Sequence, residues 1–255
     1  MSTQEKTKNS QQPDHTTPWG ALSSRLTAAL KLGAPPVAIR FHADAGEAAA
    51  ERIGRGQPPP NDRGRTGAVP AGCVFWMEAA TRTFATLPAD HANCSVGSLT
   101  HGLIGLEEAA ARDDVEAVLG AGWVDEAAVL ALPRVAERPA AIVYGPLRDA
   151  DGQPDVVLLR LNGRGLMTLR DAFPAMPIEG KPQCHIVAMA KEQGEVAASV
   201  GCALSRTRTK MMPDEMTAVI PGGRLEAAVD AIEAAAALNG MMAGYAADDA
   251  RRFET

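Results

Sequence analysis

"AAIVYGPLRDADGQPDVVLLRL", residues 140–161, is the stretch that decides the fold class. It contains two runs, residues 140–147 and 154–161, that are rich in Val, Ile and Leu and have the length of buried strands. The residues between them, "RDADGQ", include Asp-Gly, which is typical of a turn or short loop. This part of the chain is therefore predicted to contribute two neighbouring strands to a β-sheet.

Helices and further strands are predicted on both sides of this stretch. Apolar spacing indicates helices, whole or in part, at residues 19–32, 94–108, 113–135, 162–173 and 224–238. Strands are expected at residues 37–41, 84–87, 184–189 and 215–220, with a short helix from Cys73 leading into the second. Because the two kinds of element alternate irregularly, we expect a mixed α/β (α+β) fold with a mixed sheet flanked by helices.

A single compact domain is expected at residues 18–245. Residues 1–17 are polar and are predicted to form a disordered tail, and residues 246–255 a short polar tail. Within the domain, residues 46–70 are rich in Pro, Gly and Arg and are predicted to form a long exposed loop, either a lid or an insertion.

Composition and charge exclude several classes of protein. The chain of 255 residues is 46% hydrophobic and 22% charged, with a net charge of −6. An acidic chain without a long Lys/Arg run is a poor nucleic-acid binder. No apolar run is long enough for a membrane span, and the polar start lacks the apolar region of a signal peptide. We therefore expect a cytoplasmic protein that binds neither nucleic acid nor membrane.

The common catalytic motifs are absent from the sequence. It contains no G-x-x-x-x-G-K-[ST] phosphate loop, no G-x-S-x-G nucleophile elbow and no H-E-x-x-H zinc motif. Chemistry must therefore come from residues outside these patterns.

The four cysteines are the first candidates. Cys73, Cys94, Cys184 and Cys202 are separated by 20, 89 and 17 residues, and no pair forms C-x-x-C. From spacing alone, they could be thiols that pack as small buried apolar side chains. In a reducing compartment they are expected to be thiols or metal ligands and not disulfides.

The surroundings of the cysteines favour function. In "DHANCSVG", Cys94 follows Asp90 and Asn93, either of which could cap a helix, and a thiol at a helix N-terminus has a lowered pKa. His91 lies three residues before Cys94, and His185 adjoins Cys184. Each histidine could be a ligand, a proton donor or a partner of a ligand, or could have a structural role.

A cationic segment follows the last cysteine. In "SRTRTK", Arg206, Arg208 and Lys210 alternate, so they would project on one side if the segment were extended. They could hold an anionic group of a substrate or offset the charge of bound thiolates. They could equally protect an exposed strand edge.

The order of several motifs resembles the prokaryotic family named domain of unknown function 169. The shared features are "PPVAIRF", Cys73 before an apolar helix, "DHANCSVGSLTHGLIGL", "YGPL", "PDVVLLRLNGRGLMTL", Cys184, "SVGCALSR" and "DEMTAVIP". The resemblance implies that all four cysteines occupy positions where that family has recurring cysteines. It implies a site but no particular reaction.

Three hypotheses follow. In the first, Cys73, Cys94, Cys184 and Cys202, or three of them, bind a [4Fe–4S] cluster, because soft thiolates select zinc or iron–sulfur groups. His91 would then be the acid/base and Arg206 the anion clamp, for Lewis-acid or redox chemistry on a small anionic molecule. In the second, Cys94 is the nucleophile of a cofactor-free enzyme, with His91 or His185 as base. In the third, the cysteines pack or hold zinc in a structural module.

The partners expected from the sequence are a small-molecule substrate or a redox partner. A homodimer is also considered, because the Ala-rich C-terminal helix has methionines near it and could provide a dimer face. The methionines concerned are Met211, Met212, Met241 and Met242.

Overall fold

A seven-stranded sheet in the order β2-β3-β1-β4-β7-β6-β5 organises the computed structural model, which describes residues 18–51, 73–91, 94–209 and 211–253. The strands are β1 Val37–His42, β2 Phe84–Thr86, β3 Ala141–Pro146, β4 Val156–Leu161, β5 Ile178–Glu179, β6 Ala197–Ser199 and β7 Met216–Pro221. Only β5 and β6 pair in parallel, and the other neighbours are antiparallel. The prediction of a mixed α/β fold built on a mixed sheet is confirmed.

The two runs within residues 140–161 form β3 and β4, but these strands do not pair with each other. Strand β1 lies between them, and Ile39 is opposite both Tyr144 of β3 and Val156 of β4. Asp155 fastens the connection to β1, because its backbone N–H donates to Ile39 O and its carboxylate accepts from Phe41 N at 2.7 Å. The connection therefore crosses β1 and does not close a hairpin.

Eleven α-helices are present in the described part of the chain. They are α1 Pro18–Leu30, α2 Ala45–Glu51, α3 Cys73–Glu78, α4 Ser95–Thr100, α5 Leu106–Ala110, α6 Asp113–Gly120, α7 Glu126–Leu130, α8 Gly163–Ala172, α9 Ile186–Ala188, α10 Ala203–Thr209 and α11 Leu225–Ala250. The helices expected at residues 19–32 and 162–173 and the strands expected at residues 37–41, 84–87 and 215–220 are confirmed.

Four local predictions are wrong or only partly testable. Residues 184–189 form a 3-10 turn and α9 instead of a strand, because a short buried apolar run suits either structure. "SRTRTK" begins within α10, so residues 205–209 are helical and not extended, and Lys210 lies outside the described residues. The expected loop at residues 46–70 starts with α2, and its part from residue 52 lies outside the described residues, as does the expected tail at residues 1–17. Residues 246–250, expected in a polar tail, belong to α11.

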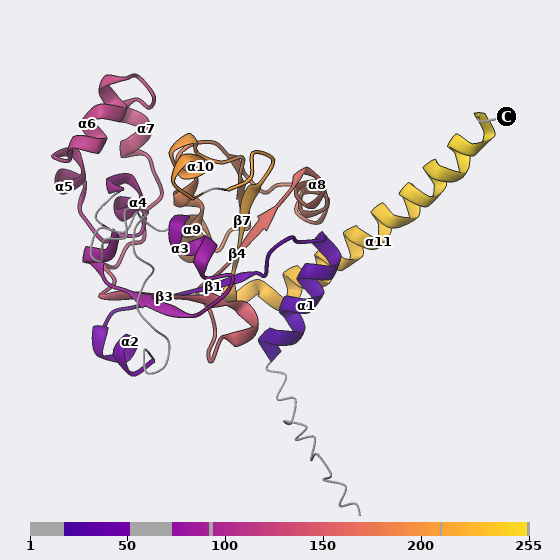
Figure 1. Cartoon of the computed structure of the whole chain (residues 1–255), viewed down its shortest axis with the longest axis horizontal. Helices are drawn as coiled ribbons and strands as arrows, with labels where there is room; N and C mark the ends of the chain where they lie inside the picture. The colour runs from indigo at the N-terminus through magenta and orange to yellow at the C-terminus, as the bar shows by residue number, and fades with distance from the viewer. Residues whose placement is uncertain (1–17, 52–72, 92–93, 210, 254–255) are drawn as a thin grey trace, which may run out of the picture.

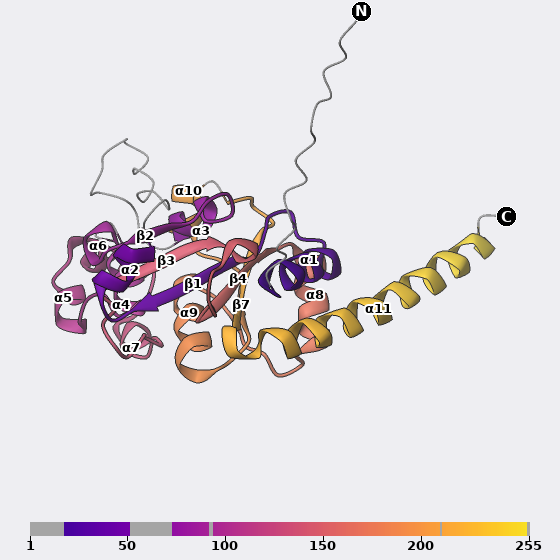
Figure 2. The same cartoon turned by 90° about the horizontal axis from the view of Figure 1, so that it is seen from below.

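Alternation along the strands gives the sheet two apolar faces. Val156 and Leu158 of β4 join the core that contains Cys73 and Cys184, which we call the cysteine face. Val157 and Leu159 join the core on the opposite face. Helices α1, α8 and α11 contribute to this second core, and Figures 1 and 2 show them grouped together, away from α4–α7. The cysteines are therefore separated from the terminal helices by the sheet.

Helix α11 packs on the domain only along its first part. Leu225, Val229 and Ile232 are fully buried or nearly so, and the helix then projects away from the other elements (Figures 1 and 2). On the projecting part, Leu238 and Met241 are 59% and 65% exposed. The dimer face expected here stays a prediction. Among the described helices, including this one, none has the length and apolar character needed to span a membrane.

Candidate functional site

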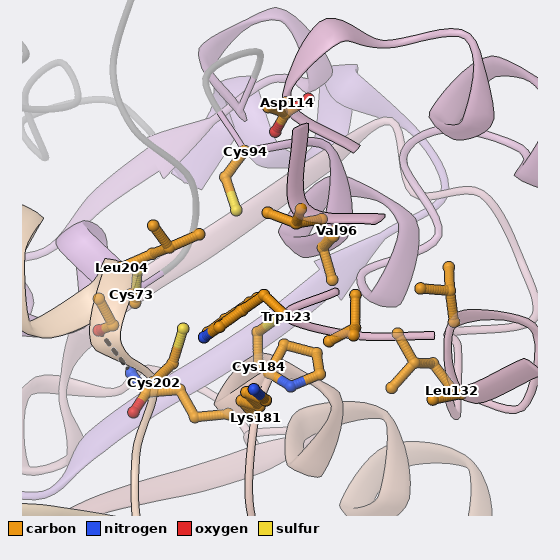
Figure 3. Close-up of a pocket in the computed structure, with 17 residues that line it drawn as sticks. Cys73, Cys94, Val96, Asp114, Trp123, Leu132, Lys181, Cys184, Cys202 and Leu204 are labelled. Atoms are coloured by element: carbon orange, nitrogen blue, oxygen red, sulfur yellow. Dashed lines mark hydrogen bonds between the residues drawn. The ribbon is translucent and has the colours of Figure 1, made fainter. Parts of the chain in front are cut away.

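All four cysteines line one cavity on the cysteine face. They come from four segments: Cys73 begins α3, Cys94 directly precedes α4, Cys184 lies in the 3-10 turn Gln183–His185, and Cys202 directly precedes α10. The cavity has a volume of about 60 Å³, which is room for several water molecules. In Figure 3 the sulfur atoms of Cys94 and Cys202 point into the same space from opposite sides. The structure thus brings together every cysteine of the chain.

The cysteines differ in their access to solvent. Cys73 and Cys184 are each 8% exposed and Cys202 is 7% exposed, whereas Cys94 is only half-buried. Cys94 is therefore the thiol that a reagent or ligand from solvent meets first.

Helix α4 positions Cys94, although its cap differs from the one expected. Cys94 is the N-cap residue, and its side chain makes no capping hydrogen bond. Asp114 of α6 supplies the carboxylate instead, accepting from Ser95 N at 2.8 Å and from Ser95 Oγ at 2.6 Å. Asp90 accepts from Leu87 N, and Asn93 lies outside the described residues. The cap at this helix is thus a long-range contact that local sequence does not reveal.

Arg206 organises the segment that carries Cys202. Its guanidinium donates to three backbone carbonyls, Val200 O at 2.8 Å, Glu215 O at 2.7 Å and Met212 O at 2.5 Å. Gly201 permits this crossing, because its φ is 112° and a Cβ there would lie 2.7 Å from Arg206 Nη2. Arg206 does not line the cavity. The guanidinium is thus engaged by the backbone, and the expected role of anion clamp stays a prediction.

The thiols interact electrostatically at close range. Burial raises the pKa of Cys184 well above its ordinary value, and the neighbouring Cys94, Cys73 and Cys202 raise it further. Thr100 opposes this by hydrogen bonding to the thiol. Four thiolates cannot coexist here without a compensating cation, whereas metal coordination would deprotonate them. Ionisation of Cys184 in this cavity therefore needs a compensating cation, such as a bound metal.

The remaining lining is mostly apolar, with a cation at the rim. Val96, Val118, Val124, Ala128, Val129, Leu132, Pro182 and Leu204 contribute apolar surface. Trp123 projects over the cavity in the view of Figure 3, and Lys181 Nζ lies 4.5 Å from the centroid of its indole ring. Lys181 is exposed and is the cationic residue among those that line the cavity. A ligand here would therefore meet apolar walls and one ammonium group.

His91 is packed behind the cavity and does not line it. The imidazole is 0% exposed, and Nε2 lies 2.9 Å from Thr86 Oγ1. Because the Thr86 hydroxyl donates to Ile142 O, Nε2 must carry the proton, which leaves Nδ1 as a bare acceptor without a partner. Burial lowers the pKa of His91 well below its ordinary value, and His101 lowers it further. The expected acid/base is thus a neutral buried imidazole.

His101, which the sequence did not single out, has a similar environment. It is 0% exposed, and Nδ1 donates to Gly97 O at 2.8 Å, so Nε2 is a bare and unpartnered acceptor. Burial lowers its pKa to about 4, an effect that the bond to Gly97 partly offsets. The His91 and His101 rings are 6.2 Å apart. Two buried imidazoles therefore stand together beside the site.

His185 is also occupied by other groups. Its Nδ1 donates to Pro182 O, and its Nε2 lies 3.3 Å from Glu179 Oε2. Neither His91 nor His185 is among the residues lining the cavity with Cys94. This arrangement gives no support to a Cys–His nucleophile pair.

The soft donor groups of the cavity are four cysteine thiols. Within the described residues, no three His, Cys, Asp or Glu side chains are arranged to hold one metal ion. Cysteine thiolates are the usual ligands of a [4Fe–4S] cluster, so the residues present have the chemistry that such a cluster requires.

Several residues of the site were missed at the sequence level. Trp123, Lys181 and Asp114 line the cavity, and Tyr144 shares the core of the cysteine face with Cys73. Trp123, Asp114 and Tyr144 are single residues far from the cysteines in sequence, and Lys181 lies three residues before Cys184 without a local motif that could have indicated it. Their positions depend on tertiary packing.

Comparison with known proteins gives one result. The model of the family described as DUF169, uncharacterised ArCR, matches residues 25–231. The match covers all four cysteines and ends within the first part of α11. No curated protein and no solved structure matches the chain significantly.

Proposed function

The chain belongs to the DUF169 family, whose description states no activity, and we propose that it is an iron–sulfur protein. Cys73, Cys94, Cys184 and Cys202 bind a [4Fe–4S] cluster in this proposal. One observation carries it: four thiols from four distant segments line the same cavity. Cysteines that only fill gaps in a core have no reason to converge, and soft thiolates are the ligands that iron–sulfur clusters use.

The donor set of the cavity favours a cluster over a single zinc ion in this proposal. The described residues offer no set of three donors for a single ion, although four thiols surround one space. Zinc remains the alternative that a metal assay separates.

The cavity supports chemistry on a small, largely apolar molecule with one anionic group. Its walls are apolar, and Lys181 at the rim takes the role of anion contact that the sequence assigned to Arg206. A bound cluster would supply either electron transfer or, with one iron open, Lewis-acid chemistry. Cys94 marks the accessible corner, because it is the half-buried thiol of the four.

The test is the metal content of the protein purified without oxygen. We expect a brown protein with broad visible absorption, equal amounts of iron and acid-labile sulfide, and no stoichiometric zinc. A colourless protein without iron or sulfide, obtained from a host well supplied with both, would overturn the proposal. Stoichiometric zinc would overturn it in favour of a structural metal site.

Single Cys→Ser variants refine the test. If the cluster is present, Cys73→Ser, Cys184→Ser and Cys202→Ser should each lower the iron content several-fold. Val96→Ala is the matched control, because Val96 lines the cavity but offers no ligand atom. A cofactor-free thiol enzyme predicts a different pattern, in which only Cys94→Ser matters and Cys73→Ser is tolerated.

A further inference from the structure

Tyr144 carries a buried hydroxyl that has no partner. The side chain, on β3, is 0% exposed, and its hydroxyl makes no hydrogen bond to any described residue. Buried tyrosine hydroxyls usually find a partner, because an unmade bond leaves a desolvated polar group. The Tyr144 hydroxyl is therefore a donor for which the described residues provide no acceptor.

The position of Tyr144 on the strand directs it to the cysteine face. Tyr144 and Ile142 alternate with Ala141 and Val143, and the first pair belongs to the core that includes Cys73 and Cys184. The tyrosine ring is held between two others, 5.6 Å from the ring of Phe75 and 5.9 Å from that of Phe84, measured between centroids. The ring is thus fixed by packing and cannot swing to solvent.

The hydroxyl lies within electrostatic range of two cysteines. Burial raises the pKa of Tyr144 well above its ordinary value, and Cys73 and then Cys184 raise it further. The nearby imidazole of His91, 6.4 Å away between centroids, does not accept from it, because both the hydroxyl and His91 Nδ1 are unpartnered. The unused donor therefore belongs to the same buried core as Cys73 and Cys184.

We propose that Tyr144 is a positioning residue of the cysteine site, whose hydroxyl donates a hydrogen bond to a sulfur atom on the Cys73–Cys184 side of the bound cluster. This inference rests on the proposed function. A thiol is a weak acceptor, whereas thiolate and inorganic sulfide carry charge and accept strongly. Hydrogen bonds to the sulfurs are among the factors that set cluster potentials. The bond stabilises the reduced cluster, which carries more negative charge, and so raises the reduction potential.

The experiment compares wild type, Tyr144→Phe and Thr168→Val, each purified without oxygen. Thr168→Val is the control, because it also removes one buried hydroxyl, from α8, which packs on the opposite face of the sheet from the cysteines. Iron and sulfide are assayed first, and the midpoint potential is then measured by redox titration. We expect all three to retain the cluster. At a fixed potential, the ratio of reduced to oxidised Tyr144→Phe should be about tenfold lower, which corresponds to about 59 mV for one electron.

A second measurement uses the apoprotein. Because the hydroxyl has no partner there, Tyr144→Phe should unfold at the same temperature as wild type or a higher one. A clear fall in this temperature would mean that the hydroxyl has a structural role in the apoprotein, which overturns the proposal.

Different results would overturn the proposed function and the role of Tyr144. A wild type without iron and sulfide overturns the proposed function and this inference with it. A wild-type cluster whose potential is unchanged in Tyr144→Phe overturns only the role of Tyr144. An equal shift in Thr168→Val would also overturn it, because the effect would then belong to any buried hydroxyl.

Discussion

Gln183 and Ser205 are joined side chain to side chain across 22 residues, with Gln183 Nε2 donating to Ser205 Oγ at 2.6 Å. Gln183 directly precedes Cys184, and Ser205 lies in α10, which begins after Cys202. Both side chains are buried, at 1% and 3% exposure. The bond therefore fixes two cysteine-bearing segments relative to each other, whether or not a metal is bound.

Removing the Ser205 hydroxyl should lower the free energy of unfolding. In Ser205→Ala, the amide of Gln183 would lose this partner, and its Oε1 is already unpartnered. We expect the apoprotein to lose about 1–3 kcal/mol of unfolding free energy in urea denaturation, the cost of a buried polar group left unpaired. Ser24→Ala is the control, because this exposed hydroxyl donates to Gly20 O. Its removal should change the free energy of unfolding by less than about 0.5 kcal/mol. Equal losses in the two variants would contradict the prediction.

Arg206 and Lys181 should respond differently to substitution. Arg206→Lys cannot reproduce the hydrogen bonds to Val200 O, Met212 O and Glu215 O, so we expect a loss of about 1–3 kcal/mol in unfolding free energy. Lys181→Met removes an exposed cation from the rim and should change stability by less than about 0.5 kcal/mol. Chemical denaturation of both variants checks this. A stable Arg206→Lys protein would restore the arginine as a candidate anion contact.

The apoprotein should lose stability in mild acid because of His91 and His101. Burial depresses the pKa of both in the folded state, to about 4 for His101, whereas an unfolded histidine titrates near about 6.5. As the pH falls from about 6.5 to 4, the unfolded state binds more protons than the folded state, so the unfolding free energy falls. Each histidine contributes up to about 1.4 kcal/mol per pH unit in that range.

The histidine contribution can be isolated with His101→Asn, which keeps a side-chain N–H that can donate to Gly97 O. We expect its unfolding free energy, measured in urea between pH 7 and pH 4, to depend on pH more weakly than that of wild type. The difference between the two slopes should correspond to about one bound proton. An unchanged slope would show that His101 does not titrate as its burial implies.

In alkali the apoprotein should lose stability because of Cys184. Its pKa in the folded state lies well above the ordinary value, mainly through burial. Above about pH 8.5 the unfolded state ionises first, so the unfolding free energy falls by up to about 1.4 kcal/mol per pH unit. Cys184→Ala should flatten this decline between about pH 8.5 and 10, and urea denaturation across that range checks it. Above that window Tyr144, with its raised pKa, acts in the same direction.

Thiol reactivity should follow burial in the apoprotein. Cys94 is half-buried, while the other three cysteines are at most 8% exposed. With a small alkylating reagent at pH 8, mass spectrometry should find Cys94 modified first and Cys184 last, because only a thiolate reacts and Cys184 resists ionisation. Modification of Cys184 before Cys94 would contradict the arrangement of the cavity.

Sequence was sufficient for elements whose pattern is local. Strands β1, β4 and β7 and helices α1 and α8 follow from apolar runs and turn residues around them. It was not sufficient for the run at residues 184–189, where continuous burial removes the periodicity that separates helix from strand. The position of β1 between β3 and β4 could not be predicted either, because Asp155 fixes it through a long-range bond to Phe41.

The candidate site was also only partly predictable from the sequence. The cysteines were found from their turn-rich surroundings and from the family resemblance, and the structure places all four in one cavity. The sequence did not show that the guanidinium of Arg206 meets three carbonyls, and the anion-clamp role expected for it stays a prediction. His91 was singled out for its closeness to Cys94 in sequence, yet its ring packs at 4.8 Å from that of Phe75, behind the cavity. Closeness along the chain did not predict side-chain direction.

The first part of helix α11 is stabilised by packing on the domain, whereas its last part is not. Its 26 residues span about 39 Å, but buried contacts are confined to the part up to Ala235. Asn239 still donates to Asp171 Oδ2 of α8 at 2.8 Å. Beyond Asn239 the helix follows a helix–coil equilibrium close to that of a free peptide, for which segments shorter than about 12–15 residues are marginal in water. Gly240 and Gly244 weaken it further, by about 1 kcal/mol each relative to alanine. In the isolated monomer, amide hydrogen exchange should therefore accelerate steadily from Ala235 toward Ala250, while the first turns exchange only with global unfolding.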